Sequence, residues 1–109
     1  MTDLIKKYGT IQKFEFTLFN EQIGIWFQMG STLDRWACTS QNTFWSPDKK
    51  CSIHVSWSEE DRKDAYVSLV TQLCEMMRAA NVENVHDLVG VSVEVQFNGD
   101  KMVSWKITD

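Results

Sequence analysis

Two short stretches of the sequence carry residue types that could do chemistry. Cys51 and His54 lie three positions apart, and His86 stands directly before Asp87. A thiol near an imidazole can form a nucleophile and its base, and both pairs contain metal-ligand types. In an extended strand, however, residues three apart leave opposite faces, so Cys51 and His54 cannot act together without a bulge. Metal-dependent phosphohydrolases use a His–Asp pair with several further ligands, which a chain with two histidines does not supply.

The rest of the sequence also favours a protein that is not an enzyme. It contains no glycine-rich phosphate loop, no GxSxG and no HExxH pattern. A cluster of carboxylates stands at the expected start of a helix, where acidic side chains complement the helix dipole and stay solvated. Its members are Glu59, Glu60, Asp61 and Asp64. We therefore expect no catalytic residue, no metal and no cofactor.

Aromatic residues suggest binding instead. The chain has five tryptophans in 109 residues, and Trp26, Trp36 and Trp45 are out of phase with the apolar pattern or lie outside its regular parts. Tryptophan is over-represented among interface hot spots. We expect the four acids to form the rim of a binding surface. The surface itself is expected to consist of aromatic residues and one arginine: Trp26, Arg35, Trp36, Phe44 and Trp45. The alternative is packing, in which residues 41–50 fold over the second face of the sheet and bury Trp26.

Alternating apolar residues predict the strands that must position these side chains. Residues 11–18, 23–29, 34–40 and 51–57 each alternate, and residues 41–50 are expected to form a loop with a turn at Pro47. In the first strand the apolar side chains share one face, which we expect to be buried: Phe14, Phe16 and Leu18. Trp26 falls on the opposite, polar face. Trp57 and Trp105 are in phase with apolar neighbours and are expected in the core.

A long helix follows the strands. Ser58 is expected to be its N-cap, with Asp61 at the capping-box distance, and Asn81 is expected to end it. Apolar residues recur at spacings of three and four over about six turns: Tyr66, Leu69, Val70, Leu73, Met77 and Ala80. A short second helix is expected between the cap Asn84 and Gly90.

The C-terminal segment predicts a hairpin around Asn98-Gly99-Asp100. A two-residue Asn98-Gly99 turn would put Trp105 on the wrong face, whereas a three-residue loop makes one apolar face. We therefore expect three apolar cross-strand pairs: Val95 with Val103, Val93 with Trp105, and Val91 with Ile107.

Together these elements predict an α+β fold in a single domain, residues 1–109. A mostly antiparallel sheet of about five to six strands should pack on one long amphipathic helix, in the order β-β-β-β-α-(short α)-β-β. The formal net charge of −4 disfavours direct nucleic-acid binding. We expect no membrane segment, and three cysteines without a CxxC pair favour the reducing cytoplasm.

The helix is followed by a Val-x-x-Val-x-Asp-Leu-x-Gly segment and then by the final hairpin. The matching residues are Val82, Val85, Asp87, Leu88 and Gly90, followed by Val93 and Val95. In this part the chain resembles small phage and prophage proteins of unknown function, although a glycine-rich stretch of some members is missing. The resemblance implies a phage or mobile-element protein in the host cytoplasm. Such proteins often bind and block a host protein, including defence systems such as CRISPR effectors.

The sequence thus leads to three hypotheses about function. The first is a protein-binding module that inhibits a host protein stoichiometrically through the aromatic surface. The second is a small-ligand or nucleotide-binding module with a pocket lined by Trp26 and Trp36. The third is a structural domain that forms a homodimer through the Trp105 strand as a sheet edge.

Overall fold

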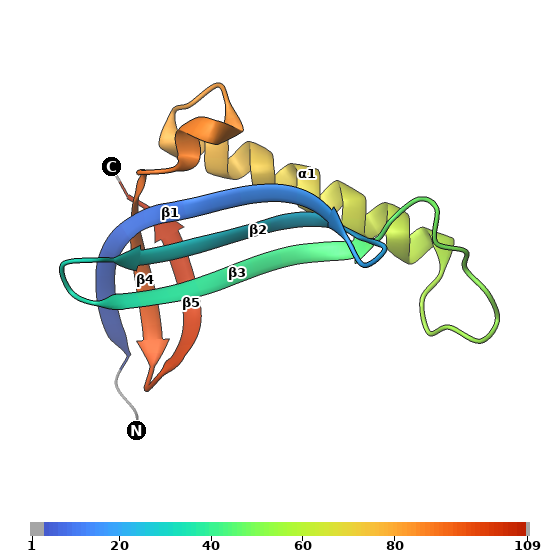
Figure 1. Ribbon diagram of the computed structural model, residues 1–109, viewed down its shortest axis with the longest axis horizontal. Helices are drawn as coiled ribbons and strands as arrows, with labels where there is room; N and C mark the ends of the chain where they lie inside the picture. The colour runs from blue at the N-terminus through green and yellow to red at the C-terminus, as the bar shows by residue number, and fades with distance from the viewer. Residues whose placement is uncertain (1–3, 109) are drawn as a thin grey trace.

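The computed structural model describes residues 4–108, which form one antiparallel sheet and one long helix (Figure 1). In chain order the elements are β1 (Ile5–Phe19), β2 (Gln22–Ser31), β3 (Trp36–Trp45), α1 (Glu59–Ala80), the 3₁₀ helix η1 (Val85–Leu88), β4 (Ser92–Asn98) and β5 (Lys101–Ile107). The strands lie in the order β3-β2-β1-β4-β5. The expected α+β class with an antiparallel sheet is confirmed, with five strands.

Two sequence-based expectations about the middle of the chain are wrong. Residues 41–45 are not loop, because β2 is long enough to pair with all of β3, from Ser31↔Trp36 to Gln22↔Trp45. Residues 51–57 are not a strand but part of a loop. The alternating residues of this segment do not share a buried face, because Ile53 is 95% exposed, and the Cys51 thiol donates a hydrogen bond to the Trp57 carbonyl at 3.1 Å.

β1 changes its partner strand halfway along its length. Its residues 5–10 pair with β4 and its residues 10–19 pair with β2, with a bulge between Ile11 and Lys13. Gly9 and Gly30 allow the close approach there, since a Cβ on Gly9 would lie 2.2 Å from the Gly30 carbonyl oxygen. The bulge and this contact bend the sheet, so β4 and β5 run at a steep angle to β2, β3 and the C-terminal half of β1 (Figure 1).

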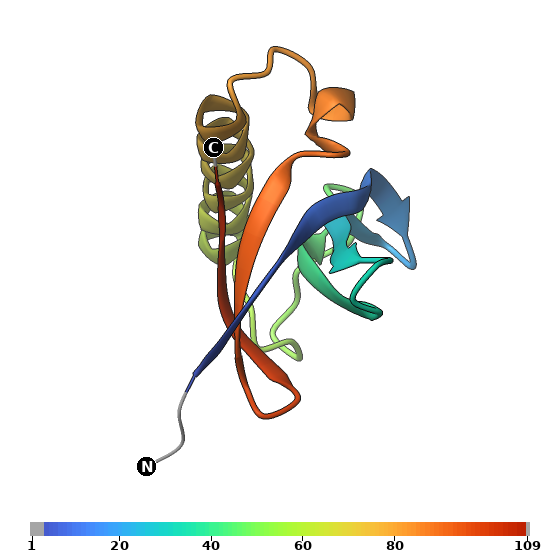
Figure 2. The same cartoon turned by 90° about the vertical axis from the view of Figure 1, so that its left-hand side faces the viewer.

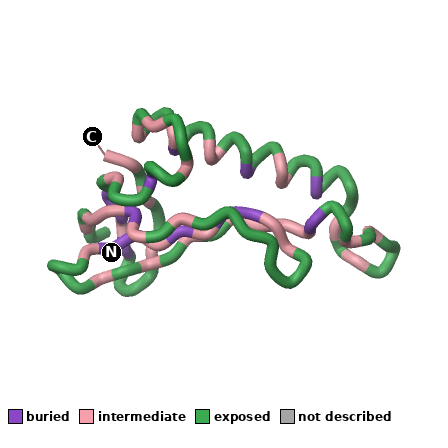
Figure 3. The backbone as a smooth tube through the Cα atoms, turned by 45° about the horizontal axis from the view of Figure 1, so that its top comes forward, coloured by how far each residue is buried: buried purple, intermediate pink, exposed green. Residues whose placement is uncertain are grey.

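The expected ends of α1 are confirmed. Ser58 and Asp61 form a reciprocal capping box with bonds of 3.1 and 2.8 Å, and Asn81 ends the helix in the left-handed conformation at φ 56°. The helix lies along one face of the sheet and turns its buried positions toward it (Figures 2 and 3). The expected second α-helix is instead the single 3₁₀ turn η1, capped by Asn84.

The hairpin of β4 and β5 has a different register from the expected one. Asn98 pairs with Lys101, and a bulge then aligns Val95 with Trp105 and Val93 with Ile107. Trp105 and Ile107 remain on the apolar face, as expected, because the shift of two residues keeps their side. Val103, expected on the same face, is 46% exposed at the bulge, and Met102 packs against the core instead. The bulge changes the phase of the alternation at Met102 and Val103, and because both residues are apolar the sequence does not show this change.

The core lies between the inner face of the sheet, which faces α1, and the helix itself. Its buried residues come from β1, β2, α1, η1 and β4: Ile11, Ile25, Phe27, Met29, Leu69, Met76, Leu88, Val93, Val95 and Phe97. Trp105 packs edge-on against Phe27 with ring centroids 5.0 Å apart, as its phase predicts. Within residues 4–108 no helix is long and apolar enough to cross a membrane.

Candidate binding surfaces

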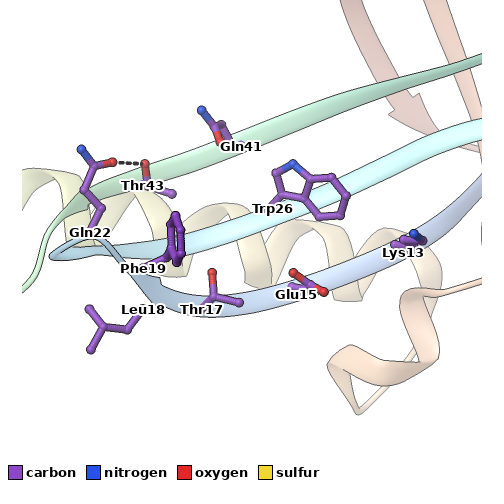
Figure 4. A pocket seen from close by; sticks show the side chains of 9 residues that line it. All are labelled: Lys13, Glu15, Thr17, Leu18, Phe19, Gln22, Trp26, Gln41 and Thr43. Carbon is purple, nitrogen blue, oxygen red and sulfur yellow. Dashed lines mark hydrogen bonds between the residues drawn. The ribbon is translucent and has the colours of Figure 1, made fainter.

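Trp26 lies on the outer face of the sheet, the face that points away from α1. Alternation along three paired strands puts Glu15, Trp26 and Gln41 side by side there. Trp26 is half-buried, and the loop of residues 46–58 lies beyond the end of β3 and lines no part of the hollow beside Trp26 (Figure 1). It lines a shallow hollow of about 550 Å³ (Figure 4). The sequence suggested a pocket lined by both Trp26 and Trp36. In the structure Trp26 lines this hollow and Trp36 does not.

Phe44 and Trp45 belong to an aromatic cluster at the far end of β3. Trp57 contacts both rings, with centroid distances of 5.7 Å to Phe44 and 6.4 Å to Trp45. The Tyr66 hydroxyl donates a 2.6 Å hydrogen bond to the Trp45 carbonyl, and Lys49 lies over the Trp45 ring. Trp57, expected in the main core, is instead half-buried in this separate cluster.

Arg62 fixes the loop of residues 46–58 against α1, and sequence reasoning missed it. Its guanidinium donates hydrogen bonds to the carbonyls of Pro47, at 3.0 Å, and of Lys49. It also lies 4.7 Å from the centre of the Trp57 ring and 3.4 Å from the carboxylate of Glu59. The residue is buried although it looks like one more charge in an acidic helix start. Only its helical position, seven residues before Leu69 on the buried side, indicates this role.

The remaining members of the predicted surface are spread over the molecule. Arg35 lies in the turn before β3, and Trp36 begins β3, at the end opposite Phe44 and Trp45. Trp36 packs against Phe97 on the inner face, with centroids 5.7 Å apart. Trp26 lies between these ends but on the outer face. The structure therefore brings Phe44 and Trp45 together and separates them from Arg35 and Trp36.

The four acids predicted as a rim lie near Phe44 and Trp45. All four are exposed in the first turns of α1: Glu59, Glu60, Asp61 and Asp64. Glu59 pairs with Arg62, and Asp61 is engaged in the capping box. Half of the cluster thus has a local structural role, as expected for carboxylates at a helix start.

The largest departure from the expected burial is an apolar groove between β1 and α1. Phe16 is 53% exposed and Leu18 62% exposed, although alternation predicts that both are buried. Val70 of α1, another expected core residue, is 63% exposed. The groove measures about 210 Å³ and no charged residue lines it: its lining is Phe16, Ile23, Pro47, Tyr66, Leu69 and Val70. We call this set the β1–α1 groove.

A free strand edge borders the β1–α1 groove. Residues 13–19 of β1 pair with β2 on one side only. On the other side, Ile11 still exchanges backbone hydrogen bonds with Gly90 and Val91, at 2.7 and 2.9 Å, and no described residue continues this pairing beyond it. Unpaired N–H and C=O groups on such an edge can accept another strand.

The residues first considered for chemistry do not form a shared site. Cys51 bonds to the loop backbone, His54 is exposed in the loop and His86 is exposed in η1. No group of three or more metal-ligand side chains occurs among residues 4–108. Burial raises the pKa of the Cys38 thiol, which favours its uncharged form.

Comparisons of this chain with protein-family models, with curated proteins and with solved structures found no match. The site must therefore be interpreted from its own geometry.

Proposed function

We propose that this chain is a protein-binding module whose docking surface is the β1–α1 groove with the free edge of β1. The observation that carries the proposal is the exposure of Phe16, Leu18 and Val70 in elements whose patterns predict burial. In the setting that the resemblance implies, the bound protein belongs to the host and is inhibited by stoichiometric binding.

The groove and the edge together favour an extended segment of the partner. Backbone groups of residues 13–19 would pair with its backbone, as in strand addition to an open sheet. Every second side chain of the added strand would then point toward α1 and enter the β1–α1 groove. A partner segment with alternating apolar residues therefore fits this surface best.

The other free edges of the sheet lack this combination. The hollow between β5 and α1 has the charged residues Glu75 and Lys106 in its lining, whereas no charged residue lines the β1–α1 groove. The middle of the inner face of β3 holds the polar residues Ser40 and Asn42, and Asn42 donates a 2.9 Å hydrogen bond to Gln72 of α1. Homodimer formation through the Trp105 strand is thus less well supported than binding at β1.

Affinity capture with matched variants tests this proposal. Leu18→Lys and Val70→Lys place a charge at the proposed surface, on residues exposed enough for the fold to tolerate it. Leu33→Lys and Ile53→Lys are the controls, since these side chains are 85% and 95% exposed and lie elsewhere. We expect the wild type and both controls to retain the same protein in a stoichiometric amount. Either surface variant should weaken its binding at least tenfold, about 1.4 kcal/mol.

Three outcomes contradict the proposal. The wild type retains no protein, or all four lysine variants bind equally, or binding is lost in Trp45→Ala or Trp26→Ala alone. The last result would support the aromatic surface predicted from the sequence. Light scattering complements the capture by measuring the oligomeric state. If the wild type is a dimer and Leu18→Lys is a monomer, the partner at this surface is a second copy of the chain.

A further inference from the structure

We infer that the hollow on the outer face of the sheet binds a neutral saccharide through Trp26. This site lies on the opposite face from the β1–α1 groove and does not depend on the proposed protein-binding function. It adds a ligand class that the docking surface does not explain.

The hollow exists because one position on the outer face has no side chain. Gly24 lies between Trp26 and Gln22 along β2, and its cross-strand neighbours are Thr17 and Thr43. A Cβ at Gly24 would lie 2.1 Å from the Asn42 carbonyl oxygen, so the close approach of β2 and β3 excludes a larger residue. Flat sheet backbone therefore forms the floor, and the surrounding side chains form the walls.

Two aromatic rings at the hollow are arranged for stacking. Trp26 shows its indole broadside to a viewer who looks into the hollow, while the ring of Phe19 is seen nearly edge-on (Figure 4). Phe19 is 73% exposed, which is unusual for so large an apolar side chain. The face of an aromatic ring is electronegative and attracts the slightly positive C–H groups that line one side of a sugar ring. Trp26 thus provides a platform and Phe19 a side wall.

Polar side chains around the rings match the hydroxyl groups of a sugar. The lining contains carboxylate, ammonium, amide and hydroxyl groups: Lys13, Glu15, Thr17, Gln22, Gln41 and Thr43. Planar amide and carboxylate groups offer adjacent donors or acceptors that suit neighbouring hydroxyls. Gln22 already accepts a 3.0 Å hydrogen bond from Thr43, which orients one amide before a ligand arrives.

The charge of the hollow favours a neutral ligand. Its lining holds one lysine and one glutamate, so their formal charges cancel, 1 − 1 = 0. A nucleotide phosphate would be stabilised by several cations or helix N-termini, and Lys13 is the one cation in this lining. A saccharide uses both the aromatic platform and the uncharged polar rim.

Titrations observed by NMR test the inference. Chitotriose, cellotriose, maltotriose, mannotriose and galactotriose are each added to about 10 mM to ¹⁵N-labelled protein, with adenosine and uridine in parallel. We expect at least one saccharide to shift the indole N–H signal of Trp26 and the amide signals of Glu15 and Gln41. Trp26→Ala and the exposed Gln41→Ala should each weaken binding at least tenfold. Thr39→Ala, on the same face outside the hollow, should leave it unchanged.

Several results would overturn the inference. No saccharide shifts these signals, or the nucleosides shift them and the saccharides do not. Equal binding by wild type, Trp26→Ala and Gln41→Ala also excludes the site. Since Gln41 is exposed, the Gln41→Ala result stands even where Trp26→Ala fails to fold. Val70 lines the groove and not the hollow, so loss of the protein partner in the Val70→Lys variant with saccharide binding intact shows that the two sites are separate.

Discussion

At the scale of single residues, Arg62 has the clearest structural role. Its guanidinium satisfies two loop carbonyls and packs on Trp57 while remaining buried. Arg62→Ala removes charge-assisted hydrogen bonds, and we expect it to lower the free energy of unfolding by about 2–3 kcal/mol. Urea denaturation measures this change. Lys63→Ala, at the exposed neighbouring position, should stay within about 0.5 kcal/mol of the wild type; an equal loss in both variants would contradict the role of Arg62.

Tyr8 gives a prediction about pH. Its hydroxyl donates a 3.1 Å hydrogen bond to the buried carboxylate of Glu94, and this bond, with the nearby negative charge, raises the pKa of Tyr8. The folded-state pKa lies above the unfolded value of about 10, so the contact stabilises the fold below about pH 10. That contribution is lost as the pH rises through the raised pKa. In ¹³C NMR titrations of labelled tyrosine, Glu94→Gln should bring the Tyr8 pKa back toward its usual value; an unchanged pKa would refute the assignment.

At the scale of elements, the N-terminus of α1 depends on one serine. Ser58→Ala removes the hydroxyl that accepts the Asp61 N–H, and we expect a loss of about 1 kcal/mol in the free energy of unfolding. Ser68→Ala, in the exposed middle of the same helix, should be neutral or slightly stabilising because alanine has the higher helix propensity. Thermal unfolding of the two variants provides the comparison. A smaller effect for Ser58→Ala than for Ser68→Ala would be incompatible with the observed cap.

The elements also show what could be predicted from the sequence and why. Ser58, Asp61 and Asn81 were identified because helix ends depend on residues close together in the chain. The pairing of β3 over residues 41–45 was missed because it depends on the length of β2, a distant segment. The loop position of residues 51–57 was missed because alternation does not show whether a segment has a strand to pair with, and Ile53, which is in phase with the alternation, is 95% exposed.

For the candidate surfaces, too, some features could be predicted from local sequence patterns and others could not. The position of Trp26 on the polar face was predicted, since it follows directly from strand periodicity. The exposure of Phe16 was not, because a strand pattern specifies which side chains share a face but not whether a helix covers that face. The role of Arg62 depends on loop carbonyls whose position no local pattern encodes.

At the scale of the whole molecule, the sheet is wider than the helix that covers it. The shortest extent of the molecule is 21 Å, which corresponds to one sheet layer and one helix layer. The helix contacts β3, β5 and η1, and it leaves the C-terminal half of β1 without cover. The long strand β1 therefore pairs with β4 in one half of the sheet and with β2 in the other, and its C-terminal half provides the free edge beside the β1–α1 groove.

Backbone amide exchange along β1 tests the central claim most directly. In the free protein, we expect alternate amides of residues 13–19, those facing away from β2, to exchange rapidly, while amides bonded to β2 are protected. When the captured partner is bound, the rapidly exchanging amides should become protected, since strand addition pairs them. Rapid exchange that persists in the complex, with new protection on β3 or β5 instead, would contradict docking at β1.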